Sequence, residues 1–322
     1  MAKIFVTRRI PENGLELLRQ AGHEVVVSEK NDVLTRDELL EALKATSYDA
    51  VLCLLTDKIN AEVLEIAPSV KIFANYAVGF DNIDVPALKG KEVFATNTPG
   101  GSSNSVAEHA MTLALTVAKR AVEADQFIRD GKYVSWAPFL LMGKELQGKT
   151  LGIIGLGRIG SRMAEIAQKG FGMKVIYSDI VRNGAMEESA GIHFHPVLET
   201  LLQEADCISL HVPLNNTTRH LMNKERLNQM KPEAILVNTS RGPVIDEAAL
   251  VEILKNKKIF GAGLDVFENE PQLAPGLAEL DNVVLTPHIA SATHAARDDM
   301  SRAVAMNIIA ALSGQTPPNA LS

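Results

Sequence analysis

The chain has 322 residues, which is enough for two domains of ordinary size. Hydrophobic residues make up 46% and charged residues 22%, as is typical of a globular protein with full cores. The net charge is −7 and the basic residues form no stripe, so a nucleic-acid partner is not expected. Cys53 and Cys207 lie in separate strand-like runs and are expected to be buried free thiols. With neither a signal peptide nor a membrane-length apolar run recognisable, we expect a cytoplasmic protein with no membrane partner.

Strand and helix patterns alternate over the first part of the chain. Alternation of this kind predicts parallel βαβ units and an α/β sheet. The turn after the first strand has no glycine fingerprint, so this sheet is not expected to hold a dinucleotide. Strands are predicted at 3–7, 24–27, 50–54, 71–75 and 92–96, and helices at 13–21, 36–45 and 60–67.

A composition break at Thr98–Ser103 predicts a hinge or linker. A capping-box pattern at Ser105–Glu108 then predicts the start of a long helix that runs to about residue 124. A second strand–helix series follows, with strands at 151–154, 174–178, 207–210, 234–238, 261–265 and 283–285 and a last helix at 292–313.

We therefore predict an α/β fold with two Rossmann-like, doubly wound parallel-sheet domains. The first domain needs the C-terminal end of the chain for completion, so it is expected to be discontinuous. Residues 1–99 and 288–322 would form a substrate-binding domain, and residues 100–287 would form the cofactor domain. The active site is expected in the cleft between the two domains, where pockets tend to form.

The most specific motif of the chain is a glycine turn inside a strand–helix–strand pattern. A strand-like apolar run is followed by Gly155, Gly157 and Gly160 in the spacing G-x-G-x-x-G, then by an amphipathic helix and a second strand that ends at Asp179. The first glycine permits a tight turn, the second lets a pyrophosphate approach the backbone, and the third lets the helix pack on the strand. The helix N-terminus offers free N–H groups to the phosphates. The motif predicts a dinucleotide site, with the acid on the ribose.

Three side chains that suit hydride transfer stand just after later strands. Reduction of a carbonyl needs a group that holds the substrate carboxylate, an acid that protonates the new alkoxide, and a carboxylate beside that acid. Arg241, His288 and Glu270 are of the right types for these three roles. By position alone, Arg241 fits a surface turn equally well, Glu270 fits a solvated loop, and His288 fits a structural role. Spacing does not show that Glu270 touches His288.

Four motifs in order resemble the D-isomer-specific 2-hydroxyacid dehydrogenase family over nearly the full chain. The resemblance implies that Arg241 binds the substrate carboxylate and carbonyl, that His288 is the acid/base, and that Glu270 is its partner. It also implies that Asp265 bonds the nicotinamide carboxamide. The motifs are Gly155–Gly160, Asn238–Gly242, Gly263–Pro271 and Thr286–Ala290.

The resemblance also implies a larger set of cofactor contacts and no metal. Val212 and Pro213 would line the adenosine side, and Thr217 and Thr239 would lie near the cofactor. The further contacts expected are Val106, Arg158, Ile159, His211, Ser240, His288 and Ala290.

The end of the second strand of the glycine motif bears on the choice of cofactor. Asp179 can accept hydrogen bonds from the ribose hydroxyls of NAD and would repel the 2′-phosphate of NADP. Arg182, three residues later, argues in the opposite direction because an arginine can bind that phosphate. Asp179 decides the prediction in favour of NAD(H) over NADP(H).

Within the family, the segment Asn75–Asp84 most resembles the glyoxylate/hydroxypyruvate reductases. The resemblance implies that the backbone N–H groups of Val78 and Gly79 receive the substrate carboxylate, as in a nest-like anion site. Asp81 and Asn82 are expected to cap and brace that loop.

Two other segments match substrate or subunit contacts of these reductases. Leu55 and Thr56 match a substrate-facing loop with a hydrophobic and then a hydroxyl residue. Trp136 lies in a segment that in such reductases reaches the neighbouring active site across a dimer, although it fits dimer packing equally well. A homodimer through the helix after Ser105 is expected.

The resulting hypothesis is the NADH-dependent reduction of a small 2-oxoacid, with glyoxylate or hydroxypyruvate favoured, to the D-2-hydroxyacid. D-lactate dehydrogenase and 3-phosphoglycerate dehydrogenase remain as enzyme alternatives. A dinucleotide-sensing protein, similar to the corepressors that share this fold, is the non-enzyme alternative.

Overall fold

The computed structural model describes residues 1–321, and the chain divides into two compact units. One unit contains Met1–Ser102 together with the chain from Ala292 onward, and the other contains Ser103–Ser291. The boundaries lie three and four residues after the predicted ones. His288 consequently belongs to the second unit, whereas the predicted boundary placed it in the first.

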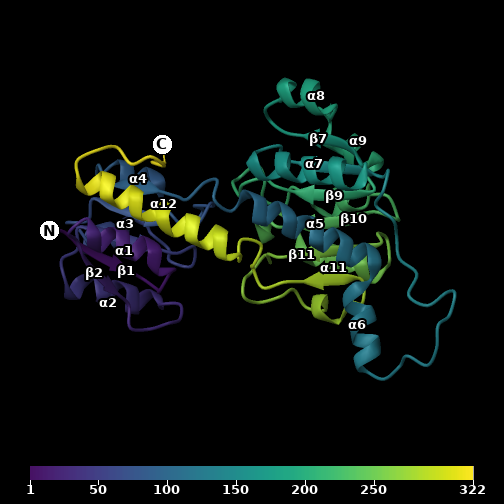
Figure 1. The fold of residues 1–322 in the computed structure, drawn as a ribbon, viewed down its shortest axis with the longest axis horizontal. Helices are drawn as coiled ribbons and strands as arrows, with labels where there is room; N and C mark the ends of the chain where they lie inside the picture. Colours follow the sequence, from purple (N-terminus) through teal and green to yellow (C-terminus); the bar gives the residue numbers. More distant parts are fainter. Residues whose placement is uncertain (322) are drawn as a thin grey trace. The chain divides into compact units, whose positions relative to one another are not determined.

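The first unit is built on a five-stranded parallel sheet of order β2-β1-β3-β4-β5 (Figure 1). Its central strands are buried along their whole length, as expected for a parallel sheet covered on both faces. The strands are β1 (Lys3–Val6), β2 (Glu24–Val27), β3 (Ala50–Cys53), β4 (Ile72–Asn75) and β5 (Phe94–Thr96). The helices are α1 (Glu12–Gln20), α2 (Arg36–Ala45), α3 (Ala61–Ile66), α4 (Val85–Lys89) and α12 (His294–Leu312).

The C-terminal helix α12 completes this first unit by packing against α1. A side chain at Gly14 could not be accommodated, because its Cβ would lie 2.1 Å from the carbonyl oxygen of Ser301. The Ser301 hydroxyl donates to the carbonyl of Pro11 at 2.7 Å and accepts from the N–H of Gly14 at 3.1 Å. These contacts explain why the end of the chain returns to its beginning.

The second unit contains a seven-stranded parallel sheet of order β12-β11-β10-β9-β6-β7-β8. Figure 1 shows α5 and α7 on one face of this sheet and α11 on the other. The strands are β6 (Thr150–Ile154), β7 (Lys174–Ser178), β8 (His193–Phe194), β9 (Cys207–Leu210), β10 (Ile235–Asn238), β11 (Gly261–Leu264) and β12 (Val283–Leu285). The helices are α5 (Ser103–Lys119), α6 (Ala121–Arg129), α7 (Arg158–Phe171), α8 (Gly184–Ala190), α9 (Leu198–Glu204), α10 (Lys224–Leu227) and α11 (Glu247–Lys255), with short 3₁₀ turns η1 (Gly242–Val244) and η2 (Leu277–Glu279).

Strand order reverses between β6 and β9, because the chain proceeds outward from β6 to β7 and β8 and then returns to β9. In open α/β sheets, ligands bind at such a switch point, outside the carboxyl ends of the strands. The glycine turn follows β6, so the fold places it at this position. Both predicted parallel sheets are confirmed.

The predicted capping box at Ser105 is wrong. Helix α5 begins at Ser103, so Ser105 lies inside it, and its hydroxyl donates to the carbonyl of Ala290 at 2.7 Å. The predicted continuous helix to residue 124 is also interrupted, because Arg120 adopts a left-handed conformation (φ 53°) between α5 and α6.

Two predictions from composition can be compared with the structure. Cys53 and Cys207 are both buried and free, as predicted. Across residues 1–321, none of the helices combines the length and the apolar character that a membrane span requires.

Candidate active site

The glycine turn adopts the geometry that a dinucleotide site requires. Gly155 has φ +95°, and a Cβ there would lie 2.8 Å from the backbone of His211, so only glycine fits this turn. A Cβ at Gly160 would lie 2.2 Å from the carbonyl oxygen of Gly155, which explains how closely α7 approaches the turn. Gly157 caps α7 and has no neighbour within 4 Å of its ideal Cβ position. The turn therefore leaves open space at a helix N-terminus, where a pyrophosphate would be stabilised.

Asp179 follows β7 and is tied to the glycine turn. One carboxylate oxygen accepts from the N–H of Leu156 at 2.6 Å, and the other accepts from the N–H of Val181 at 3.2 Å. The side chain is partly exposed. Its position beside the turn is the one that a ribose-binding acid takes in this type of fold.

The loop after β9 packs against the same turn. An ideal Cβ at Gly155 would lie 2.9 Å from Cγ1 of Val212, so Val212 contacts the turn closely. The ring of His211 lies 2.9 Å from the hydroxyl of Ser209, measured at Nε2. Burial lowers the pKa of His211 to about 4, so this histidine is neutral at pH 7. Further along, Thr217 lies in an exposed turn and hydrogen-bonds to Asn215.

Other expected cofactor residues lie on α5 and in the loops after β10 and β12. Val106 and Ala290 are buried, and Ser240 hydrogen-bonds to Asn238 at 2.8 Å. The hydroxyl of Thr239 is buried and has no hydrogen-bond partner among residues 1–321. Because a buried hydroxyl without a partner is costly, this atom fits the expected contact with a bound cofactor.

Arg241 is presented by a loop that packs on the loop carrying Glu270. The backbone of Gly242 approaches residue 267 so closely that a Cβ on this glycine would lie 1.9 Å from the carbonyl of Phe267. The carbonyl of Arg241 accepts from Asn238 Nδ2 at 2.9 Å, which fixes the loop to the end of β10. The positive charge of Arg241 is near enough to contribute to lowering the pKa of the Glu270 carboxyl.

His288 and Glu270 form a hydrogen-bonded pair. Nδ1 of His288 lies 3.0 Å from Oε2 of Glu270, and Oε1 of Glu270 accepts from the N–H of Phe267 at 3.0 Å. Burial alone would raise the pKa of the Glu270 carboxyl, but the hydrogen bond and charge of His288 lower it below its usual value. Both side chains retain access to solvent, at 28% and 33% exposure. The pair suits proton transfer by the other ring nitrogen of His288, Nε2.

The backbone of His288 is held in a left-handed conformation with φ 53°. Its N–H donates to the carbonyl of Asp265 at 2.9 Å and to that of Thr286 at 3.0 Å. Histidine adopts this region more readily than bulky residues do, but the conformation still costs free energy unless the surroundings fix it. Strain of this kind is common at functional sites.

The carboxylate of Asp265 is fully buried and fixes the loop that carries His288. It accepts from the hydroxyl of Thr286 at 2.6 Å and from the N–H groups of Ile289 at 2.9 Å and Ala290 at 2.8 Å. Nε2 of His109 on α5 lies 3.0 Å from the Thr286 hydroxyl and 3.4 Å from Asp265. Burial would raise the pKa of Asp265, but these hydrogen bonds lower it. Sequence reasoning missed His109, since a single histidine in an apolar helix gives no signal of its partners.

In the first unit, the loop after β4 is anchored through its carbonyl groups. Asn75, which is fully buried, donates to the carbonyl of Gly79 at 2.9 Å, and Asn97 donates to that of Val78 at 2.7 Å. The N–H groups of Val78 and Gly79 have no acceptor among residues 1–321. Two adjacent N–H groups without acceptors fit the predicted anion site.

Asn82 braces this loop against the loop after β3, as predicted. Its Nδ2 donates to the carbonyl of Leu54 at 3.1 Å and to that of Asp57 at 3.0 Å. The segment that contains Leu55 and Thr56 lies between these two anchor points and is exposed. The expected substrate residues of the first unit are thus brought together.

Comparison with known proteins identifies the family. The pattern of the NAD-binding domain of D-isomer specific 2-hydroxyacid dehydrogenases matches residues 111–290, more than half of the chain. The chain is 48% identical to the glyoxylate reductase of Thermococcus litoralis over 321 residues, covering 98% of this chain and 96% of that reductase. It belongs to the D-isomer-specific 2-hydroxyacid dehydrogenase family.

Solved structures of other proteins share the fold of this chain. A protein from Thermus thermophilus is 40% identical with a TM-score of 0.92, covering 99% of this chain and 100% of that one. An NADPH-dependent glyoxylate/hydroxypyruvate reductase from Sinorhizobium meliloti is 33% identical with a TM-score of 0.86, covering 100% and 98%. Because this relative uses NADPH, membership of the family does not decide the cofactor.

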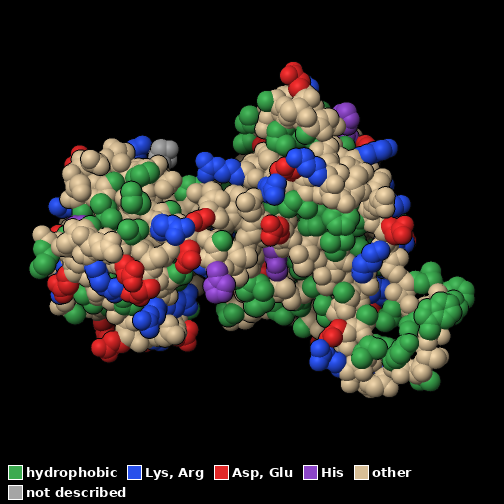
Figure 2. All heavy atoms as spheres, viewed as in Figure 1, with side chains coloured by type: hydrophobic (Ala, Val, Ile, Leu, Met, Phe, Trp, Pro, Cys, Tyr) green, Lys and Arg blue, Asp and Glu red, His purple; other side chains and the backbone are tan. Residues whose placement is uncertain are grey.

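A segment after α6 exposes apolar side chains on the second unit. Residues 132–143, here called the arm, form neither helix nor strand. Figure 2 shows hydrophobic side chains gathered on the projection that continues from α6. The exposed fractions are 92% for Val134, 79% for Trp136 and 82% for Phe139. Large apolar residues at this exposure mark an interaction surface.

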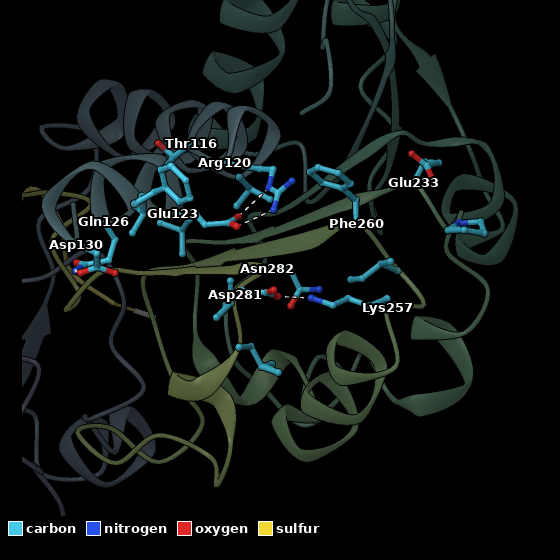
Figure 3. Close-up of a pocket in the computed structure, with 18 of the residues that line it drawn as sticks. Thr116, Arg120, Glu123, Gln126, Asp130, Glu233, Lys257, Phe260, Asp281 and Asn282 are labelled. Atoms are coloured by element: carbon cyan, nitrogen blue, oxygen red, sulfur yellow. Dashed lines mark hydrogen bonds and ion pairs between the residues drawn. The ribbon is translucent and has the colours of Figure 1, made fainter. Parts of the chain in front are cut away.

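A pocket of about 580 Å³ lies at the opposite end of the strands from His288 (Figure 3). It is lined where α5 and α6 meet the amino ends of β11 and β12. Among the charged residues labelled there, Arg120 bonds to Glu123 at 2.7 Å, and Lys257 pairs with Asp281. None of the residues described for the candidate active site lines this pocket. The charges of these four lining residues are balanced within the two pairs.

Proposed function

We propose that the protein is a glyoxylate reductase that reduces glyoxylate, and hydroxypyruvate as a second substrate, to the corresponding 2-hydroxyacid. A chiral product would have the D configuration. The observation that carries the proposal is the His288–Glu270 pair, with Nδ1 and Oε2 3.0 Å apart, beside the loop of Arg241. The sequence relatives named glyoxylate reductase from Thermococcus litoralis and Pyrococcus furiosus, at 48% and 46% identity, support the choice of substrate.

Each of the three residues has a distinct role in the proposed reaction. The planar guanidinium of Arg241 would bind the substrate carboxylate and polarise the neighbouring carbonyl. Nε2 of protonated His288 would donate its proton to the carbonyl oxygen as that oxygen gains charge. The carboxylate of Glu270 would fix the ring through Nδ1 and stabilise the imidazolium before transfer.

The glycine turn and Asp179 would hold the nicotinamide cofactor, which when bound would supply the hydride for the carbonyl carbon. Asp265 would bond the nicotinamide carboxamide while it holds the loop of His288 in place. In the first unit, the N–H groups of Val78 and Gly79 would bind a carboxylate, with Leu55 and Thr56 as the other expected substrate contacts.

We propose NADH as the preferred cofactor. Asp179 presents a carboxylate beside the turn, and a carboxylate disfavours a 2′-phosphate. Arg182 could offset this effect, but its guanidinium is bonded to Glu187, with Nη2 and Oε2 2.7 Å apart. An NADPH/NADH ratio of kcat/KM above one would overturn this assignment.

A second copy of this chain is the proposed partner of the arm. Helix α5, which the sequence suggested as the contact, buries most of its apolar residues within its own unit. The solvent-exposed apolar surface lies on α6 and the arm instead, where the side chains of Ile128 and Trp136 are 57% and 79% exposed. Whether Trp136 also reaches the partner's substrate site stays a prediction.

The proposed activity is tested by initial rates with four oxoacids and both cofactors. The oxoacids are glyoxylate, hydroxypyruvate, pyruvate and 3-phosphohydroxypyruvate, and oxidation of NADH or NADPH is followed by absorbance. We expect the highest kcat/KM with glyoxylate and NADH. A higher value with pyruvate or 3-phosphohydroxypyruvate would replace the substrate assignment, and no oxidation with any oxoacid would favour a binding protein.

A further inference from the structure

Helix α8 carries a carboxylate that holds Arg182, the arginine three residues after Asp179 of the proposed ribose site. Nε of Arg182 lies 2.9 Å from Oε1 of Glu187, and Nη2 lies 2.7 Å from Oε2, so the pair is bidentate. Glu187 is only 16% exposed, whereas Arg182 is 66% exposed. The glutamate is therefore the fixed member of the pair, and the arginine is the member that could move.

Aromatic residues of neighbouring strands fix Glu187 and Arg182 in this arrangement. The hydroxyl of Tyr177 donates to Oε1 of Glu187 at 2.8 Å and accepts from the N–H of Asn183 at 2.8 Å. The guanidinium of Arg182 lies 5.8 Å from the ring centre of Phe194, within cation–π range. The rings of Tyr177 and Phe194 are in contact, with centroids 5.2 Å apart.

The order of the strands shows on which side of β7 the side chain of Arg182 lies. The sheet order runs β6-β7-β8, with the glycine turn after β6, Asp179 after β7 and Phe194 on β8. Arg182 lies over Phe194, so it is held on the side of β7 that faces away from the glycine turn. A 2′-phosphate on a ribose bound at Asp179 would compete with Glu187 for the same guanidinium.

We propose that Glu187 is a specificity-determining residue that excludes NADP(H) by sequestering Arg182. The proposal rests on the proposed binding of a dinucleotide at the glycine turn. Glu187 acts on selectivity because it occupies the arginine that would bind a 2′-phosphate, and its own charge is balanced by that arginine. Asp179 alone would leave this arginine available.

A binding experiment with four forms of the full-length protein tests this inference. The forms are the wild type, Glu187→Gln, Arg182→Gln and the double variant, and the probes are NAD⁺ and NADP⁺ measured by isothermal titration calorimetry. In Glu187→Gln we expect NADP⁺ to bind about fivefold to tenfold more tightly, as for one partly exposed charge pair, and NAD⁺ to change less than about twofold. Adding Arg182→Gln should abolish the gain.

The single variant Arg182→Gln makes the test independent of how well Glu187→Gln folds. Because the arginine is already occupied in the wild type, its removal should change the affinity for NADP⁺ by less than about twofold. A severalfold loss of NADP⁺ affinity in this variant would overturn the proposal. A gain in Glu187→Gln that persists in the double variant would also overturn it, since the arginine would not be involved.

Glu188→Gln is the matched control, because Glu188 is the next residue of α8 and is exposed. We expect its NADP⁺ affinity to equal that of the wild type. The proposed NADH preference is judged separately by the wild-type ratio of NADP⁺ to NAD⁺ affinity. That preference would fail if the wild type bound NADP⁺ more tightly, whereas the Glu187 inference fails only on the comparison of variants.

Discussion

Replacing Glu270 by glutamine tests the role of the His288–Glu270 pair. Glutamine keeps the shape of the side chain and an oxygen that can accept from the N–H of Phe267, but it removes the negative charge 3.0 Å from Nδ1 of His288. The pKa of the Glu270 carboxyl is lowered by His288, so the wild-type carboxylate is ionised throughout the neutral range. The variant therefore changes one charge at one position.

The size of the effect follows from the distance and the exposure. Two unit charges about 4 Å apart interact by about 4 kcal/mol at an effective dielectric constant of about 20. Both side chains are close to one-third exposed, so screening by water reduces this value to about 1–2 kcal/mol. Because about 1.4 kcal/mol corresponds to a tenfold change in rate, loss of this interaction should lower the rate by about tenfold.

The assay is kcat/KM for glyoxylate reduction near pH 7, compared between the wild type and the variants. In Glu270→Gln we expect kcat/KM about tenfold below that of the wild type, because the imidazolium of His288 loses the carboxylate that stabilises it. Glu268→Gln is the matched control, because Glu268 lies in the same loop but is 2.5 Å from the ring of His220 instead. A kcat/KM of Glu270→Gln equal to that of the wild type would refute the reasoning.

Three further outcomes are expected. Arg241→Ala should lower kcat/KM for glyoxylate by at least about 10²-fold and leave the NADH dissociation constant unchanged, as stopped-flow titration would show; an equal loss of NADH binding would contradict the role. Trp136 is the only tryptophan, so its emission should be blue-shifted and protected from acrylamide if a second copy covers the arm, whereas a monomer by sedimentation with quenchable emission would exclude the dimer. Asp265→Asn should cost about 2 kcal/mol of unfolding free energy near pH 7 in urea titrations. Because the pKa of Asp265 is lowered, this difference should be full above about pH 4 and shrink as the pH falls through the lowered value. A difference that does not depend on pH would contradict the charge assignment.

The strands were predictable from the sequence because each is a short apolar run that the parallel sheet buries on both faces. Cys207–Leu210 and Val283–Leu285 have the predicted ends, and Ile235–Asn238 begins one residue later. The C-terminal helix was also predictable as part of the first unit. The short helices α8 and α9 were missed, since seven residues give too little periodicity to identify a helix.

Side-chain pairings were not predictable to the same degree. The sequence placed Glu270 and His288 after neighbouring strands, but only the structure shows that Nδ1 and Oε2 are 3.0 Å apart. The capping-box error at Ser105 has a physical cause: the pattern is present, but the serine hydroxyl bonds to Ala290, far away in the sequence. The Arg182–Glu187 pair escaped notice for a similar reason, because α8 itself was not recognised.

The rate of NADH oxidation with glyoxylate, compared between the wild type and His288→Gln, tests the central claim most directly. We expect the wild type to reduce glyoxylate and the variant to lose about 10²- to 10⁴-fold in kcat, the range for loss of a general acid. The NADH dissociation constant of the variant should stay within about twofold of the wild type, because the glycine turn and Asp179 are untouched. Turnover of glyoxylate by His288→Gln at a rate close to that of the wild type would contradict the account.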